Sequence, residues 1–258
     1  MCFTLKRMFS FSFLKRKVNP IFILGSGRSG THLLARAFMN QPDTDVYIEN
    51  HKLFNIVSNF VSGYNTTEYR ETDIIAMYKK ILDSSKTKWL VDKTHSAIWL
   101  ADTLVAAFPN ARFVGIHRGV LATVNSMLQH SEVMLWYNKL PLNGVNRFLG
   151  ITDENKDYFE SLPLEVKCAC RVLAHTQRLL SLKKQYPTIV YLVQYNDFYT
   201  QQNKVLHELS SFLKWHDTLR LEPLHNDGLD KWKTELTTEQ IEHITQYVRA
   251  QGMEEYLY

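Results

Sequence analysis

Short apolar runs recur along the chain, and segments with apolar residues at helical spacing follow most of them. Four runs are brief and continuous enough to be strands buried on both faces, at residues 21–24, 89–91, 112–117 and 188–193. Four segments with helical spacing follow these runs, at residues 30–40, 100–107, 121–129 and 205–213. This alternation predicts an α/β fold with a central parallel β-sheet flanked by helices.

The segments between these units complete the expected organisation. Residues 50–88 and 131–185 are predicted to be mostly helical, and no repeat or linker interrupts the chain. We therefore expect a single domain over residues 19–258. Residues 1–18 alternate basic and aromatic side chains and are predicted to be a basic, flexible leader. Their apolar run is too short for a signal sequence or a transmembrane segment.

Composition and charge narrow the class of ligand. The chain has 258 residues, 45% of them hydrophobic, and a formal net charge of +4. This mildly basic balance suits a polyanionic ligand, but it lacks the clustered charge of a nucleic-acid-binding protein. The three cysteines, Cys2, Cys168 and Cys170, do not have zinc-ligand spacing, so no metal site is expected. A reducing cytoplasmic location is the simplest interpretation.

A glycine-rich loop joins the first predicted strand to the first predicted helix. Gly25 and Gly30 stand five residues apart and Thr31 follows, which is the frame of a phosphate-binding P-loop. In a nucleoside triphosphatase the next residue is lysine and the one after it binds magnesium. Here Thr31 and His32 occupy those positions, and the cation is Arg28, inside the loop. A metal-free anion site is favoured, with a P-loop kinase or NTPase and a non-catalytic nucleotide-binding module as alternatives.

Two motifs at defined spacing carry a family resemblance. The stretch Gly27-Arg28-Ser29-Gly30-Thr31 resembles the 5′-phosphosulfate loop of sulfotransferases that use 3′-phosphoadenosine 5′-phosphosulfate (PAPS). Arg118 after a predicted strand, with Ser126 eight residues later, resembles the 3′-phosphate motif of that superfamily. Guanidinium groups suit phosphate oxygens physically as well. The resemblance implies a P-loop sulfotransferase fold with PAPS as co-substrate and no metal.

Further motifs resemble two branches of this superfamily. Lys93-Thr94-His95 is similar to the Lys-Thr-His element of cytosolic sulfotransferases. Glu49 lies 21 residues after Arg28, the offset of the catalytic glutamate in tyrosylprotein sulfotransferases, and residues 229–232 resemble a Leu-x-Lys-Trp element of that branch. His51 departs from that branch, which has arginine there.

The resemblance implies roles for individual residues. We expect Arg28 and Lys93 to stabilise charge on the leaving phosphate and the sulfuryl group. Glu49 is expected to be the general base, with His95 as the alternative. The expected PAPS contacts are Gly27, Arg28, Ser29, Gly30, Thr31, His32, Arg118, Ser126, Tyr195 and Lys231.

The acceptor is less constrained by the sequence. A small hydroxylated metabolite or sugar is the expected acceptor, a peptide tyrosine is the alternative, and a homodimer is compatible with the sequence. Segments 50–75 and 131–165 are expected to shape the acceptor pocket. Their aromatic residues could line the pocket or pack in the core, and these are Phe54, Phe60, Tyr64, Trp136 and Tyr137.

Overall fold

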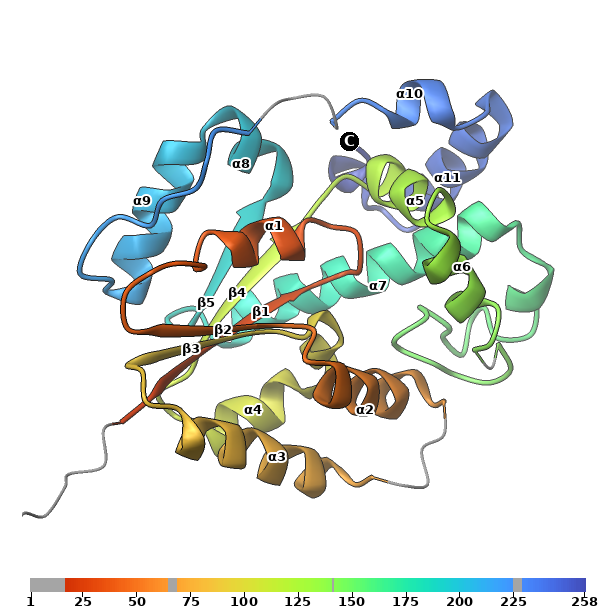
Figure 1. Cartoon of the computed structure of the whole chain (residues 1–258). Coiled ribbons are helices and arrows are strands. Elements are labelled where there is room, and N and C mark those ends of the chain that lie inside the picture. Colours follow the sequence, from red (N-terminus) through yellow and green to blue (C-terminus); the bar gives the residue numbers. More distant parts are fainter. Residues whose placement is uncertain (1–16, 65–68, 141, 225–228) are drawn as a thin grey trace, which may run out of the picture.

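The computed structural model describes residues 17–64, 69–140, 142–224 and 229–258 (Figure 1). The predicted leader, residues 1–18, lies outside the described residues except for Lys17 and Val18.

Five parallel strands form one sheet with the order β2-β3-β1-β4-β5. The strands are β1 (Asn19–Gly25), β2 (Thr44–Ile48), β3 (Trp89–Lys93), β4 (Arg112–His117) and β5 (Val190–Gln194). The predicted parallel sheet and the four predicted strands are confirmed. Central strands β1 and β3 are buried along almost their whole length, because helices cover both faces.

The strand β2 was not predicted. It is an edge strand that pairs only with β3, and all five of its residues are half-buried. Its only apolar run is Val46-Tyr47-Ile48, which is as short as the run at residues 89–91 and follows the polar residues Thr44 and Asp45, so its strand signal is weak. Its position nevertheless matters for the site, since Glu49 follows it directly.

Helices cover both faces of the sheet (Figure 1). They are α1 (Thr31–Arg36), α2 (His51–Ser62), α3 (Glu71–Ser84), α4 (Ala101–Ala107), α5 (Val120–Leu128), α6 (Ser131–Tyr137), α7 (Leu164–Gln185), α8 (Tyr195–Thr200), α9 (Gln202–Leu213), α10 (Trp232–Glu235) and α11 (Thr238–Ala250). Ile21 and Ile23 of β1 face α1, α8 and α9, whereas Phe22 and Leu24 face α2, α3, α4 and the second half of α7. This alternation follows from the two-residue period of a strand.

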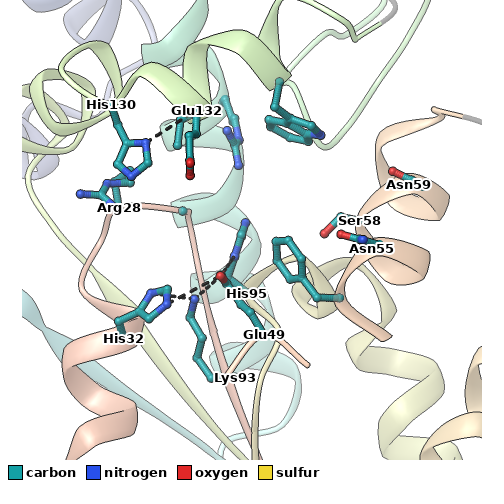
Figure 2. Close-up of a pocket in the computed structure, with 15 residues that line it drawn as sticks. Arg28, His32, Glu49, Asn55, Ser58, Asn59, Lys93, His95, His130 and Glu132 are labelled. Carbon is teal, nitrogen blue, oxygen red and sulfur yellow. Dashed lines mark hydrogen bonds and ion pairs between the residues drawn. The ribbon is translucent and has the colours of Figure 1, made fainter. Parts of the chain in front are cut away.

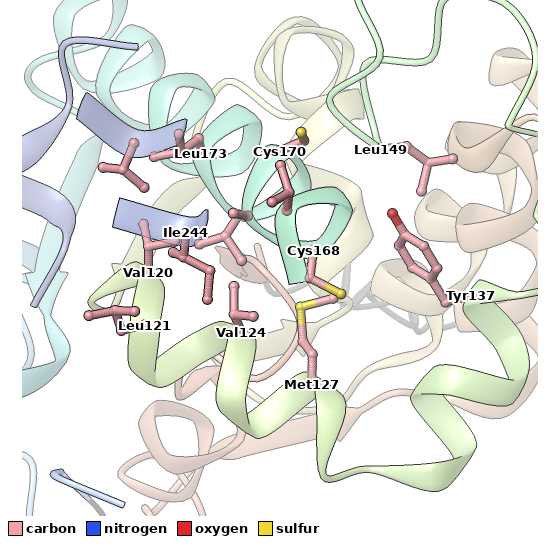
Figure 3. Packing of buried hydrophobic residues seen from close by; sticks show 14 of the residues in the cluster. Val120, Leu121, Val124, Met127, Tyr137, Leu149, Cys168, Cys170, Leu173 and Ile244 are labelled. Atoms are coloured by element: carbon pink, nitrogen blue, oxygen red, sulfur yellow. The ribbon is translucent and has the colours of Figure 1, made fainter. Parts of the chain in front are cut away.

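A third hydrophobic cluster lies beyond the sheet, where α5 packs against α7 and α11 (Figure 3). Val124 and Met127 of α5 meet Cys168 and Leu173 of α7, and all four side chains are buried. This packing fixes the first half of α7, which borders the site described below.

The prediction of mostly helical structure over residues 131–185 is only partly right. Helices α6 and α7 lie within this segment, but the residues between Tyr137 and Leu164 that the structure describes form turns, an antiparallel bridge between Asn146 and Ile151, and a short 3-10 helix, Phe159–Ser161. The turns surround buried residues such as Phe148 and Phe159. Apolar residues that anchor a loop resemble a helical pattern in the sequence.

Candidate functional site

The candidate site lies where the carboxyl ends of the five strands meet. Glu49 follows β2, Lys93 ends β3 with His95 just after it, Arg118 follows β4, and Tyr195 follows β5. The glycine-rich loop follows β1, between the other four. Ligands of open parallel sheets bind outside these strand ends. The fold thus brings together residues that are widely separated in the sequence.

The glycine-rich loop is held closely by its surroundings. A side chain on Gly25 would come within 2.7 Å of the Ile116 carbonyl oxygen, and one on Gly30 within 2.4 Å of the Tyr195 ring. Gly30 has φ of 101°, and Arg28 adopts the left-handed region with φ of 74°. Left-handed backbone at a non-glycine residue is rare and concentrates at functional sites. The loop is therefore a rigid turn with its only cation at a strained position.

Arg28 connects the loop to the second predicted phosphate motif. Its Nε donates a hydrogen bond to Ser126 Oγ at 3.1 Å, across 98 positions of sequence. The Arg118 guanidinium lies 4.4 Å from the centre of the Tyr195 ring, which itself covers Gly30. The two predicted halves of a bisphosphate site are thus adjacent.

Lys231 is exposed at the start of α10. This short helix packs against α5, the helix of Ser126. Asn125 Nδ2 donates to Glu235 Oε2 at 2.6 Å and joins the two helices. Lys231 therefore lies on an element attached to the helix that carries Ser126.

Both candidate bases belong to one cluster of contacts (Figure 2). Glu49 Oε1 accepts a hydrogen bond from Lys93 Nζ and lies 3.2 Å from His95 Nδ1. His32 Nδ1 lies 2.9 Å from Lys93 Nζ, and His32 Nε2 lies 3.6 Å from Glu49 Oε2. The side chain of His32 therefore contacts the Lys93 and Glu49 side chains. Glu49, like Arg28, has left-handed backbone, with φ of 49°.

Burial and the contacts within this cluster determine which of its side chains are charged. Burial would raise the pKa of Glu49, but the hydrogen bond with His95 and the charge of Lys93 lower it to about 2. Burial lowers the pKa of His95 to about 4 against the opposing effect of Glu49, and burial also lowers the pKa of Lys93. At neutral pH, Glu49 is ionised and His95 is neutral.

These charges determine the tautomer of His95. An ionised carboxylate can only accept, so His95 Nδ1 carries the proton and donates it to Glu49. His95 Nε2 is then a hydrogen-bond acceptor, and it lies 3.3 Å from where a Cβ atom on Gly27 would be. A neutral imidazole nitrogen that can accept a hydrogen bond is thus placed next to the glycine-rich loop, and the other ring nitrogen contacts a carboxylate.

A cavity of about 500 Å³ opens in front of this cluster. It is lined by Gly27, Arg28, His32, Glu49, Phe54, Asn55, Ser58, Asn59, Lys93, His95, His130, Glu132, Val133, Trp136 and Arg171. Among the predicted aromatic residues, Phe54 and Trp136 line it. Tyr137 is buried in the core, Phe60 lines a different cavity, and Tyr64 is exposed.

Several lining residues were not predicted, and Arg171 is the most unusual of them. It lies in the middle of α7 with no motif around it, and it is 2% exposed. A charged residue within an otherwise apolar helical face was the one available signal, because such residues are rarely buried.

No group of three or more His, Cys, Asp or Glu side chains in the described part of the chain is arranged to hold a metal ion. Within the same residues, every helix is too short or too polar to cross a membrane.

Comparison with known proteins gives the family and the fold. A family model described as the Sulfotransferase family matches residues 20–218. No curated protein matches the sequence. A sulfotransferase domain from the curacin biosynthetic pathway is similar in structure, with a TM-score of 0.59, 16% identity, and 92% of this chain and 98% of that chain covered.

Two further structures share the fold. The sulfotransferase domain of the Synechococcus PCC 7002 olefin synthase has a TM-score of 0.55 and 15% identity, with 90% of this chain and 96% of that chain covered. A sulfotransferase from Alicyclobacillus acidocaldarius has a TM-score of 0.52 and 14% identity, with 89% and 95% covered. The family match spans more than half of the chain, and the protein therefore belongs to the sulfotransferase family.

Proposed function

We propose that this sulfotransferase uses PAPS and transfers the sulfuryl group to a hydroxyl of a small acceptor. The observation that carries this proposal is the contact between Arg28 and Ser126, which unites the loop expected at the 5′-phosphosulfate with the motif expected at the 3′-phosphate. A nucleotide that carries phosphate groups at both its 5′ and its 3′ position fits such a joined site. Guanidinium and hydroxyl donors are suited to phosphate oxygens and need no metal.

The donor would be held by two groups of residues. The loop residues Gly27 to Thr31 would hold the 5′ side, with the backbone N–H groups of the loop aided by Arg28. Arg118, Ser126 and Lys231 would hold the 3′-phosphate, and Tyr195 would pack beside them. PAPS supplies an activated sulfuryl group, whose bond to the phosphate oxygen breaks as the acceptor oxygen attacks.

The contacts of His95 support it as the general base. Its Nε2 is a neutral acceptor that lies beside the loop, and it would take the acceptor's hydroxyl proton. Glu49, which the sequence favoured as the base, already has its Oε1 engaged by Lys93 and His95, and its pKa of about 2 lies below that of His95, about 4. We therefore assign Glu49 the task of orienting His95 and stabilising it once it is protonated, as in carboxylate–histidine pairs.

Lys93 would stabilise the charge on the transferred group. Its ammonium has three N–H donors, and contacts with Glu49 and His32 use two of them. The third donor remains for a sulfuryl or bridging oxygen. The charge on that oxygen grows as the bond breaks, so a fixed cation there lowers the barrier.

The cavity favours a small acceptor over a peptide tyrosine. Its volume of about 500 Å³ lies within the range usual for small-molecule sites. A P-loop kinase or NTPase is disfavoured because Thr31 stands where that class has its phosphate-binding lysine.

Transfer of the radiolabelled sulfuryl group from PAPS to a panel of hydroxylated metabolites, sugars and tyrosine peptides, with release of adenosine 3′,5′-bisphosphate, tests this proposal. We expect label on a small hydroxylated acceptor, without added metal. Label only on tyrosine peptides would establish the peptide alternative, and hydrolysis of ATP with magnesium but no use of PAPS would overturn the assignment.

A further inference from the structure

Arg171 carries a buried charge that has no partner among the residues that the structure describes. It lies on α7, is 2% exposed, and lines the cavity. Among the residues that the structure describes, no carboxylate or hydrogen-bond acceptor contacts its guanidinium, and its Nε is fully enclosed without a partner. Buried arginines are normally paired with a carboxylate or satisfied by hydrogen bonds.

The close neighbours of this guanidinium are aromatic or neutral. Its Cζ lies 5.0 Å from the centre of the Trp136 ring and 4.7 Å from that of Phe148. Tyr137 and Cys168 are also near, but burial raises the pKa of both, that of Cys168 to about 12. Neither is an anion at neutral pH, so the positive charge of Arg171 is not neutralised by them.

The surroundings of Arg171 are tightly built. Gly150, with φ of 76°, lets its loop approach α7 so closely that a Cβ atom would lie 2.4 Å from the Cys170 carbonyl oxygen. This loop carries Phe148, which is 1% exposed. One turn along α7, His175 Nδ1 donates to the Arg171 carbonyl oxygen at 2.8 Å, and its ring meets Phe148 edge-on at 5.1 Å.

If Arg171 served only the stability of the fold, its charge would be a disadvantage. An unpaired charge in a buried position lowers stability, and burial lowers the pKa of Arg171 to about 10. An apolar side chain of similar size would pack between the same rings without this cost. The charge is the unfavourable feature, and an anion bound from the cavity would offset its cost.

The position of Arg171 indicates whether the donor or the acceptor would carry the anion that it binds. Its Nη2 and His95 Nε2 each lie 3.3 Å from the Cβ position of Gly27, so both reach the same corner of the cavity. The expected phosphate ligands Arg28, Arg118 and Ser126 come from the loop and from β4 and α5. Arg171 comes from α7 instead and is flanked by Trp136, which lines the cavity with Phe54.

The carboxylates that line the cavity do not neutralise the charge of Arg171, so a ligand can supply one negative group there. Its two carboxylates are Glu49, which contacts Lys93, and Glu132, which is exposed. A single unpaired guanidinium matches a group with one negative charge, and its planar fork matches the two oxygens of a carboxylate.

We infer that Arg171 binds a carboxylate of the acceptor, and that the acceptor is a hydroxylated carboxylic acid. The inference rests on the proposed function and adds the substrate class. Trp136 and Phe54 would contact the apolar part of this acid, while its hydroxyl lies at His95 Nε2.

Matched pairs of ligands test this inference. A panel of aliphatic and aromatic hydroxy acids is compared with the methyl esters of the same compounds, by calorimetric binding to the protein with and without adenosine 3′,5′-bisphosphate (PAP), and by kcat/KM for label transfer from PAPS. For at least one pair, we expect the acid to be preferred by about tenfold or more, the range of a charge-assisted hydrogen bond. The Arg171→Met variant should lose this preference, and Arg171→Lys should keep part of it.

Three controls separate this role from others. Arg178→Met removes an arginine from the same helix that pairs with Asp102 instead of lining the cavity, and it should leave the preference unchanged. Thermal unfolding of Arg171→Met should occur at the same or a higher temperature, which excludes misfolding. Its affinity for PAP should equal that of the wild type.

Two results would overturn the inference. One is a wild-type protein that prefers no acid over its ester. The other is an Arg171→Met variant that loses PAP affinity, or loses transfer to acid and ester equally, because Arg171 would then act on the donor. Failure of the wild type to bind PAP would contradict the proposed function instead, while the binding comparison without PAP would still test Arg171.

Discussion

Two regions with opposite electrostatic character border the cavity. The strand edge, formed by the glycine-rich loop and the residues at the ends of β2 to β5, holds Lys93 and His95 each in contact with Glu49. The helical wall, formed by Trp136 and Arg171 with Phe148 packed against both, holds a cation near two aromatic rings, and no acceptor among the described residues contacts this cation. A cluster that is neutralised internally can move a proton, whereas an unpaired cation provides binding energy to a ligand.

The largest expected effect concerns the proton acceptor of the strand edge. His95→Ala should lower turnover by about 10²–10⁴-fold, the usual contribution of a general base. The variant should still bind PAP, as measured by calorimetry. Glu49→Gln should lose less, because the imidazole remains. If Glu49→Gln abolished turnover while His95→Ala retained it, Glu49 would be the base.

Stability changes of opposite sign should distinguish the two regions. Lys93→Met leaves the half-buried Glu49 carboxylate without its cation and should destabilise the fold, by about 1–3 kcal/mol after allowing for solvent around Glu49. Arg171→Met removes an unpaired buried charge and should stabilise the fold by about 1–4 kcal/mol. Denaturant unfolding measures both. If both substitutions destabilised the protein equally, the strand edge and the helical wall would not differ in their contribution to stability.

The acid limb of the pH profile is a finer test of the strand edge. His95 must be neutral to accept a proton, and its pKa is lowered to about 4, so kcat/KM should stay level from about pH 5 to pH 8 and fall near pH 4. The lowered pKa also means that the unfolded chain takes up the proton first, so stability declines as pH falls from about 6.5 towards 4. An acid limb near pH 6.5 would contradict this environment for His95.

The strand edge was largely predictable from the sequence, and the helical wall was not. Arg118 and Lys93 each lie at the end of an apolar run, so the rule that ligands bind at strand ends places them without knowledge of packing. Glu49 was found only by its offset from Arg28, because the short apolar run of its strand β2 is a weak strand signal. The contact between Glu49 and His95 spans 46 positions and could not be predicted.

The helical wall depends on packing between distant segments. Arg171 faces the cavity because α5 and α11 fix α7, and because a turn at Gly150 brings Phe148 against it. No periodicity or motif encodes these contacts. The sequence therefore predicted which residues meet at the strand ends, and the placement of Arg171 required the structure.

The central claim is that one joined site binds both phosphates of the donor. Calorimetric titration of the protein with PAP in the presence of a metal chelator tests it most directly, with adenosine 5′-monophosphate as the matched ligand. We predict that PAP binds without metal and more tightly than the monophosphate, and that Arg118→Ala weakens PAP by about 10- to 100-fold, the range of hydrogen bonds to charged groups. Absence of PAP binding, a requirement for magnesium, or equal affinity for the two nucleotides would contradict the account.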